Sequence, residues 1–308
     1  MILALFVIIG LLVTGIMNYL IRRIINNKAC DIFWFSRENI VEINGIKTHI
    51  NIKGEGEPLL FVHGSQMNLY DFNLNIDFFS KHFKVYAFDM VGCGFTDKPK
   101  ADYSPQYFSD FINYVMLHYN INKASFVASS WGGGHVFHFA LNYPEKVNKL
   151  VMSSPCGFKH EMMSSYNILS IPVLGKLALL FNSKSLVRSE LCKAFHDKSI
   201  VDEELVQSVY IPFYTKGCIN ATVKSARNDD FSFVQNNLEK IDAPVLLIWG
   251  SCDKIHPKWM MDEMQNRLKN SHLCILDNVG HLPHKEAFND FNKCTFEFLV
   301  NGLNKGGL

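Results

Sequence analysis

Three features are missing from this sequence of 308 residues: an excess of one charge, a metal-ligand spacing and a repeat. The formal net charge is +1, so composition gives no reason to expect nucleic acid as a partner. The eight cysteines are scattered, without a C-x-x-C pair or a Cys/His spacing typical of zinc. We therefore predict no metal. Scattered cysteines are typical of reduced, mostly buried thiols, which favours a reducing compartment.

Charged side chains are also missing from residues 1–17, and Arg22 and Arg23 close the apolar segment. About 20 apolar residues cross a bilayer core of ~30 Å, so we predict a membrane anchor helix over residues 1–25. A secretory signal peptide is the weaker alternative, because the segment has neither a basic start nor a small-x-small cleavage site. The basic residues follow the segment, so the positive-inside rule places the main domain on the cytoplasmic face.

Short apolar runs alternate with helix-length stretches after the N-terminal segment. Asn44-Gly45 between two alternating runs predicts a hairpin. Buried strands are expected at 59–62, 84–88, 124–128, 149–152, 245–249 and 272–276, and helices lie between them, for example at 105–119 and 131–142. This alternation predicts an α/β fold with a mostly parallel sheet that helices cover on both faces.

One long insertion interrupts that alternation. It lacks a convincing buried strand and predicts helices at 166–181, 184–195, 202–210 and 215–227. Such an insertion is too structured to be a loop, so we expect a helical cap over the catalytic end of the sheet. The predicted organisation is an anchor (1–25), a first part of the core (39–156), the cap (157–240) and a second part of the core (241–303).

A serine, an aspartate and a histidine each follow a predicted strand: Ser130, Asp253 and His281. Active residues of open parallel sheets gather beyond the carboxyl ends of the strands. Small residues at Ala128 and Gly132 fit a tight strand-to-helix turn that exposes a nucleophilic serine. Ser129 is an alternative nucleophile, but the spacing to Gly132 favours Ser130.

The three side chains suit nucleophilic catalysis. His281 would take the proton of Ser130, and Asp253 would orient and stabilise the imidazole. The backbone N–H groups of Trp131 and Ser65 are the expected donors to a developing oxyanion.

The sequence contains other histidines and aspartates, which fit these roles less well. His284 is a weaker base because it lies in a predicted helix, and Asp242 precedes its strand. His135 and His138 lie three apart on a helix but have no evident third ligand. Asp89 is expected to order its turn.

These motifs resemble the α/β-hydrolase fold family over residues 39–299. The shared segments are His63-Gly64, Asp89 to Gly94 with Thr96 to Pro99, the serine turn at Ser130, Asn142 to Val147, Gly250 to Pro257, and Gly280-His281 with Glu286. The layout of an anchor followed by a domain resembles membrane-bound monoacylglycerol lipases. The tryptophan directly after the serine, Trp131, resembles the residue at that position in proline iminopeptidases. Ser65-Gln66-Met67 departs from the Gly-Pro-Gly of iminopeptidases and many carbon–carbon bond hydrolases. A serine rather than an aspartate nucleophile argues against epoxide hydrolase and haloalkane dehalogenase chemistry.

We therefore expect a membrane-anchored serine hydrolase that cleaves carboxylic esters of a small or lipid-like molecule and needs no cofactor. Cleavage of an amide, thioester or carbon–carbon bond is the alternative within enzymes, because fold alone does not choose the bond. A non-catalytic ligand-binding module and a membrane scaffold are alternatives from other classes. Apolar residues of the insertion either line an acyl-binding cleft or simply pack: Met162, Met163, Ile168, Leu169, Leu174, Leu177, Leu179, Leu180 and Phe181.

Overall fold

The computed structural model describes residues 39–158 and 164–302, together with positions 10, 13–15, 17 and 20. Most of the predicted anchor, residues 1–25, lies outside this described part. Within it, no helix has both the length and the apolar character needed to span a bilayer.

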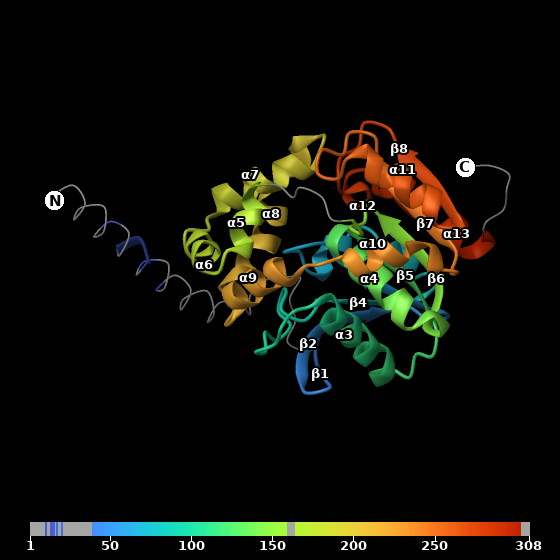
Figure 1. Ribbon diagram of the computed structural model, residues 1–308, viewed down its shortest axis with the longest axis horizontal. Helices are drawn as coiled ribbons and strands as arrows, with labels where there is room; N and C mark the ends of the chain where they lie inside the picture. Colours follow the sequence, from blue (N-terminus) through green and yellow to red (C-terminus); the bar gives the residue numbers. More distant parts are fainter. Residues whose placement is uncertain are drawn as a thin grey trace.

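An eight-stranded sheet forms the centre of the protein (Figure 1). The strand order is β1-β2-β4-β3-β5-β6-β7-β8, with β1, β2 and β4 antiparallel neighbours and all later pairs parallel. The strands are β1 (Ile40–Ile43), β2 (Ile46–Lys53), β3 (Pro58–Val62), β4 (Lys84–Phe88), β5 (Ala124–Ser129), β6 (Val147–Ser153), β7 (Val245–Gly250) and β8 (Ser271–Leu276). The mostly parallel sheet confirms the predicted fold class. The predicted hairpin is also present, and Asn44 (φ 48°) and Gly45 (φ 76°) both take the positive φ that its tight turn requires.

Helices cover both faces of the sheet. One apolar cluster joins a face of the sheet to α3, α4, α10 and α11, and a second joins the opposite face to α2 and α13. The bounds of these core helices, including the short α12, are α2 (Ile76–Phe79), α3 (Pro105–His118), α4 (Ser130–Asn142), α10 (Ser232–Asn237), α11 (Lys258–Arg267), α12 (Pro283–Glu286) and α13 (Phe288–Asn301). Burial on both faces explains why the strands are continuous apolar runs rather than alternating ones.

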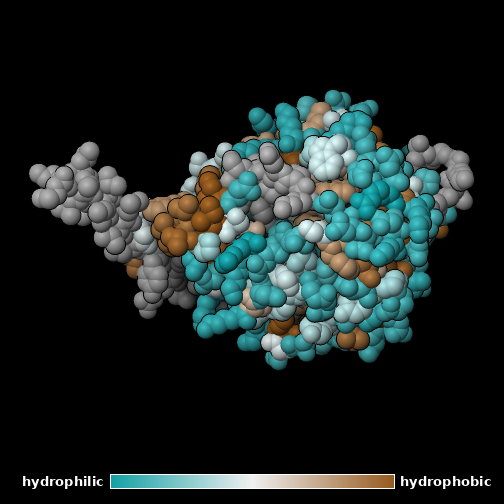
Figure 2. Space-filling model, in the orientation of Figure 1, coloured by the Kyte–Doolittle hydropathy of each residue, from teal (hydrophilic) through white to brown (hydrophobic). Residues whose placement is uncertain are grey.

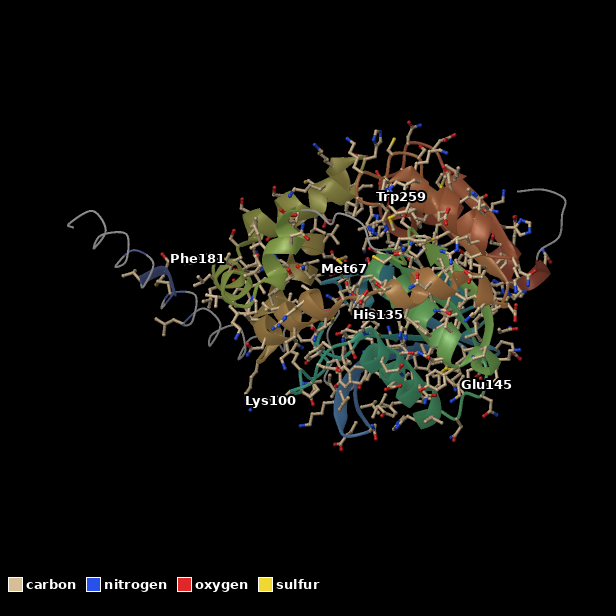
Figure 3. All side chains as sticks on the ribbon, viewed as in Figure 1. Met67, Lys100, His135, Glu145, Phe181 and Trp259 are labelled. Carbon is tan, nitrogen blue, oxygen red and sulfur yellow. The ribbon has the colours of Figure 1, made fainter. Side chains whose placement is uncertain are left out.

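The insertion forms a helical layer with an apolar cluster of its own (Figure 1). Its helices are α5 (Ser164–Ser170), α6 (Pro172–Leu180), α7 (Lys184–Ala194), α8 (Glu203–Tyr210) and α9 (Cys218–Asn228). We expected one helix over 166–181, but the structure has two, because Pro172 begins a new helix at a position where its missing N–H costs nothing. Met67 and Leu282 from the core belong to this cluster, and Figure 3 shows Met67 between the cap helices and the core.

Short 3-10 helices complete the described part of the chain. They are η3 (Leu69–Phe72), η4 (Pro144–Lys146), η5 (Lys198–Ile200), η6 (Ile211–Tyr214) and η7 (Leu238–Lys240).

Candidate active site

The serine turn lies between β5 and α4. Ser130 is the first residue of α4 and has φ +47°, a left-handed conformation that costs a non-glycine residue about 1 kcal/mol or more. Gly132 has no room for a side chain, because a Cβ there would lie 2.3 Å from the carbonyl oxygen of His63 and 2.7 Å from that of Val62. The strained turn and the close packing of α4 on β3 together hold Ser130 at the carboxyl edge of the sheet.

Ser130, His281 and Asp253 form a continuous hydrogen-bonded chain. Ser130 Oγ lies 2.8 Å from His281 Nε2, and His281 Nδ1 lies 2.9 Å from Asp253 Oδ2. The three residues come from the ends of three different strands, β5, β8 and β7. Their side chains meet because parallel strands bring their carboxyl ends to one edge of the sheet.

The charge of Asp253 sets the direction of these bonds. Burial alone would raise the pKa of Asp253, but the charge and hydrogen bond of His281 outweigh it and hold the pKa at about 2. Its second oxygen accepts the backbone N–H groups of Ile255 (2.8 Å) and His256 (3.0 Å). An ionised carboxylate can only accept, so Nδ1 of His281 carries the proton and Nε2 is free to accept from Ser130.

The loop that carries His281 is joined to the cap. The N–H of His281 donates to the carbonyl of Ala194 (2.7 Å). The Glu286 carboxylate accepts from the N–H groups of Gly280 (2.7 Å), His196 (3.2 Å) and Asp197 (2.6 Å). The position of the base therefore depends on the end of α7 as well as on β8.

A buried histidine shapes the turn after β3. The N–H of Met90 donates to His63 Nε2 (3.0 Å), so Nδ1 carries the proton and donates to the carbonyl of Gly64 (2.8 Å). Burial lowers the pKa of His63, which agrees with this neutral form. A Cβ on Gly64 would lie 3.6 Å from Ser130 Cβ, so the turn runs beside the serine. Ser65, the predicted oxyanion donor, follows directly, and Ser65 and Trp131 both line the same cavity as Ser130.

A second buried acid–histidine pair supports this turn. Asp71 Oδ2 accepts the N–H of Gly64 (3.2 Å), and Asp71 Oδ1 lies 3.0 Å from His284 Nε2. His284 Nδ1 in turn lies 3.2 Å from Ser153 Oγ. Burial alone would raise the pKa of Asp71, but His284 beside it and Lys285 hold it at about 2. His284, set aside above as a base, thus bonds Asp71 and Ser153 rather than the serine turn; sequence reasoning missed this pair.

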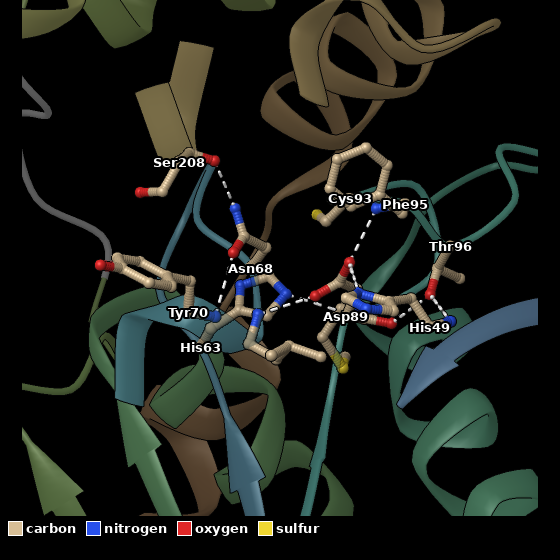
Figure 4. Close-up of polar contacts among 12 residues, drawn as sticks. His49, His63, Asn68, Tyr70, Asp89, Cys93, Phe95, Thr96 and Ser208 are labelled. Carbon is tan, nitrogen blue, oxygen red and sulfur yellow. Dashed lines mark hydrogen bonds and ion pairs between the residues drawn. The ribbon is translucent and has the colours of Figure 1, made fainter. Parts of the chain in front are cut away.

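Asp89 lies behind the same turn (Figure 4). Its carboxylate accepts from the N–H groups of Leu69 (2.7 Å) and Phe95 (2.7 Å) and lies 2.9 Å from His49 Nδ1. Asn68 reaches from this turn to the cap, where its amide donates to the carbonyl of Ser208 (2.7 Å). These contacts tie the turns after β3 and β4 to each other and to α8, as expected for a residue that orders its turn.

A cavity of about 420 Å³ opens beside the serine. Most of its lining residues are apolar, and the cap contributes ten of them: Ile168, Leu169, Ala178, Leu179, Leu186, Val187, Leu191, Ala194, Val209 and Phe213. Of the described residues that line it, none is a lysine or an arginine. Of the predicted cleft residues, Ile168, Leu169 and Leu179 line this cavity, whereas Leu174, Leu177 and Phe181 are exposed. Met162 and Met163 lie outside the described residues, and Leu180 is not part of the lining.

His256 lies against the base. Its ring meets that of His281 edge-on at 4.6 Å, and its Nδ1 lies 2.9 Å from the carbonyl of Ser154. Ligand atoms of Asp253, His256 and His281 come within 4.8 Å of one another, a grouping that metal sites share. In this structure His281 uses both nitrogens for Asp253 and Ser130. His135 and His138 belong to no such group among the described residues.

Ser129 points elsewhere. Its Oγ is buried and has no hydrogen-bond partner among the described residues. A Cβ on Gly64 would lie 3.6 Å from this oxygen, so it faces the turn after β3. His281 contacts Ser130 instead.

A serine–histidine–aspartate chain at the carboxyl edge of a parallel sheet, under a helical cap, defines a hydrolase of the α/β class. Residues 57–288 match the family described as alpha/beta hydrolase fold, and the chain belongs to that family.

Known proteins of the family resemble the chain over most of its length. It is 27% identical to an uncharacterized hydrolase, YugF, of Bacillus subtilis, over 75% of this chain and 85% of the relative. It is 26% identical to a 2-hydroxy-6-oxononadienedioate/2-hydroxy-6-oxononatrienedioate hydrolase of Comamonas testosteroni, over 84% and 93%. The solved meta-cleavage product hydrolase CumD of Pseudomonas fluorescens IP01 superposes with a TM-score of 0.75 at 26% identity, covering 86% of this chain and 98% of that one.

Proposed function

We propose that this protein is a serine hydrolase that cleaves carboxylic esters with an apolar, lipid-like acyl group. The observation that carries the proposal is the Ser130–His281–Asp253 chain at the wall of an apolar cavity of about 420 Å³. The three residues supply a nucleophile with a base, and the cavity supplies an apolar lining that hydrocarbon can contact.

The reaction would proceed in two halves. Ser130 Oγ attacks the ester carbonyl while its proton passes to His281 Nε2, and the imidazolium gains stabilisation from Asp253. The tetrahedral intermediate collapses, and the alcohol leaves with the proton from His281. Water then gives a proton to His281 and attacks the acyl-serine, which releases the carboxylic acid and restores Ser130.

The developing oxyanion would be held by two backbone N–H groups, those of Trp131 and Ser65. Loss of one such donor typically lowers the rate by about 100- to 1,000-fold. The turn that carries the second donor runs beside the serine, since a Cβ on Gly64 would lie in van der Waals contact with Ser130 Cβ (3.6 Å).

The cavity lining favours a neutral substrate. A buried carboxylate is stabilised best by a cationic partner, and the described lining includes no lysine or arginine. The acidic residue of that lining, Glu190, is paired with Lys193 (2.6 Å). A second candidate comes from the names of the similar proteins, hydrolases of dienedioates and of meta-cleavage products. Those dienedioates are dicarboxylates, and the described lining offers them no lysine or arginine, so the apolar lining argues for the ester.

Covalent labelling tests the nucleophile. A fluorophosphonate probe should label the full chain and the Ser129→Ala variant, but not Ser130→Ala. The Ser129 variant is the matched control, because it removes the neighbouring hydroxyl from the same turn. A folded wild-type protein that takes no label would overturn the proposal and leave a ligand-binding module.

A substrate series tests the bond and the chain length. We expect p-nitrophenyl esters to be cleaved, with kcat/KM rising from acetyl to medium acyl chains as the cavity fills. A 2-hydroxy-6-oxo-dienedioate should be a poor substrate. The reverse ranking would replace the ester assignment with the second candidate.

A further inference from the structure

Helix α6 presents apolar side chains to the outside of the cap. Val173 is 68% exposed, Leu174 51% and Leu177 46%, and Ile171 and Phe181 at the two ends of the helix are exposed as well. Figure 2 shows this patch as the brown area over the outer end of the cap, and Figure 3 shows Phe181 at the edge of the same helix. We call these five residues the α6 patch.

The packing of the cap does not account for the patch. The inward side of α6 already buries Gly175 and Leu179, and Leu179 belongs to the apolar cluster of the cap. The patch is therefore a second apolar side of the same helix. A surface helix normally turns polar residues to water, and a contiguous exposed apolar patch marks an interaction site.

The charge around the patch is positive. Residues 162–189 contain Lys176, Lys184 and Arg188 and no aspartate or glutamate. Lys184 and Arg188 share a single carboxylate, that of Glu203 on α8, so the three cations outnumber the acidic group paired with them. Lys176 is an exposed residue of α6 itself, between Leu174 and Leu177. Apolar side chains flanked by basic ones fit the boundary between hydrocarbon and anionic headgroups.

Exposed apolar residues on the helices that precede and follow α6 reach the cavity. Ile168 (45% exposed) and Leu186 (46% exposed) flank α6 in sequence, and both also line the cavity that holds Ser130. Hydrocarbon that leaves a bilayer at this face would stay against apolar side chains on its way to the serine.

We propose that the α6 patch docks onto the surface of a lipid bilayer that contains anionic lipid, and that the cavity takes its substrate from there. The delivery step rests on the ester hydrolase function proposed above, whereas the docking does not. The other occupants are residues 1–21 of the same chain and a second copy of the protein, and the experiment distinguishes both.

Depth-dependent quenching tests the docking. The full chain would carry Leu177→Trp in the patch or Leu117→Trp on α3, an exposed leucine outside the cap, and each would be bound to phosphatidylcholine–phosphatidylglycerol vesicles with brominated acyl chains. We expect the fluorescence added by Leu177→Trp to be largely lost and that added by Leu117→Trp to persist. Both proteins keep the N-terminal segment, so anchoring is equal in the two.

Three results would overturn the docking. Equal quenching of both tryptophans would show no preferred face. Emission from Leu177→Trp that is blue-shifted without vesicles and unquenched with them would mean that residues 1–21 cover the patch. In that case, removal of residues 1–21 would abolish the blue shift. The same blue-shifted, unquenched emission from a protein that dimerises as its concentration rises would mean that a second copy covers the patch.

Kinetics test the delivery. Leu174→Ser combined with Leu177→Ser should raise the apparent KM for a vesicle-borne ester by about tenfold, because two half-exposed leucines lose their contact with hydrocarbon. The rate on a water-soluble short-chain ester should stay unchanged, and Leu117→Ser should alter neither. If the wild type cleaves no ester, the proposed function fails while the quenching result still decides the docking. Equal KM values for variant and wild type would overturn the delivery.

Discussion

At the scale of single residues, hydrogen-bond partners decide what each buried histidine can do. Met90 N–H fixes His63 with its proton on Nδ1, and Asp253 fixes His281 in the same tautomer. His63 then holds a backbone carbonyl, whereas the free nitrogen of His281 faces a serine. Of these two histidines with the same tautomer, therefore, only His281 is placed to act as a base.

Asp253→Asn is expected to remove most of the activity without unfolding the protein. The asparagine amide can donate to Nδ1, which moves the imidazole proton to Nε2 and leaves Ser130 without a base. We expect kcat on an ester to fall by about 10⁴-fold. Asp242→Asn, an exposed residue before β7, is the matched control and should keep full activity. A loss below tenfold in Asp253→Asn would contradict the assigned role.

The two buried aspartates predict a loss of stability in acid. Asp71 and Asp253 both have a pKa of about 2 in the folded protein, below the value of about 3.8 expected when unfolded. A lowered carboxyl pKa stabilises the fold above the unfolded value, and this contribution disappears as pH falls from about 4 to about 2. Each carboxylate should contribute about 2 kcal/mol to the free energy of unfolding.

Urea unfolding at pH 6 and pH 3 measures this contribution. Asp71→Asn should lose less stability between the two pH values than the wild type, because one of the two titrating carboxylates is gone. Identical losses in the two proteins would show that Asp71 is not the titrating group.

At the scale of elements, the turn from β5 to α4 holds Ser130 in place but lowers the stability of the fold. Its φ of +47° is one that glycine adopts freely. We expect Ser130→Gly to be more stable than Ser130→Ala by about 1 kcal/mol, although both lack the nucleophile. Ser129 has φ −114°, so Ser129→Gly should be less stable than Ser129→Ala. Thermal unfolding of the four variants checks the two signs, and the same sign at both positions would contradict a strained turn.

At the scale of the whole molecule, the prediction to test is that the N-terminal segment holds the protein at a membrane. The predicted anchor over residues 1–25 stays a prediction, as does its cytoplasmic orientation. Full-length protein should sediment with membranes and resist extraction by carbonate, and a chain that begins at Asn39 should do so less completely. Protease added to sealed inside-out vesicles should digest the main domain, whereas protection there would reverse the orientation.

Much of the architecture followed from the sequence alone because the signals are local. Apolar runs marked β3 to β8, Asn44-Gly45 marked the hairpin, and Ser130, Asp253 and His281 each stood just after a strand. Strand ends in a parallel sheet share one edge, so order along the chain was enough to propose that the three side chains meet.

Only the tertiary structure decided which partners lie together across long separations. Asp71 and His284 are 213 positions apart, and neither local periodicity nor a motif connects them. The exposed side of α6 could not be recognised from the sequence either, because Leu174 and Leu177 are leucines at a helical spacing, as buried core leucines also are. A sequence pattern records that a side chain is apolar, whereas its neighbours in space determine whether it faces the core, the cavity or the outside.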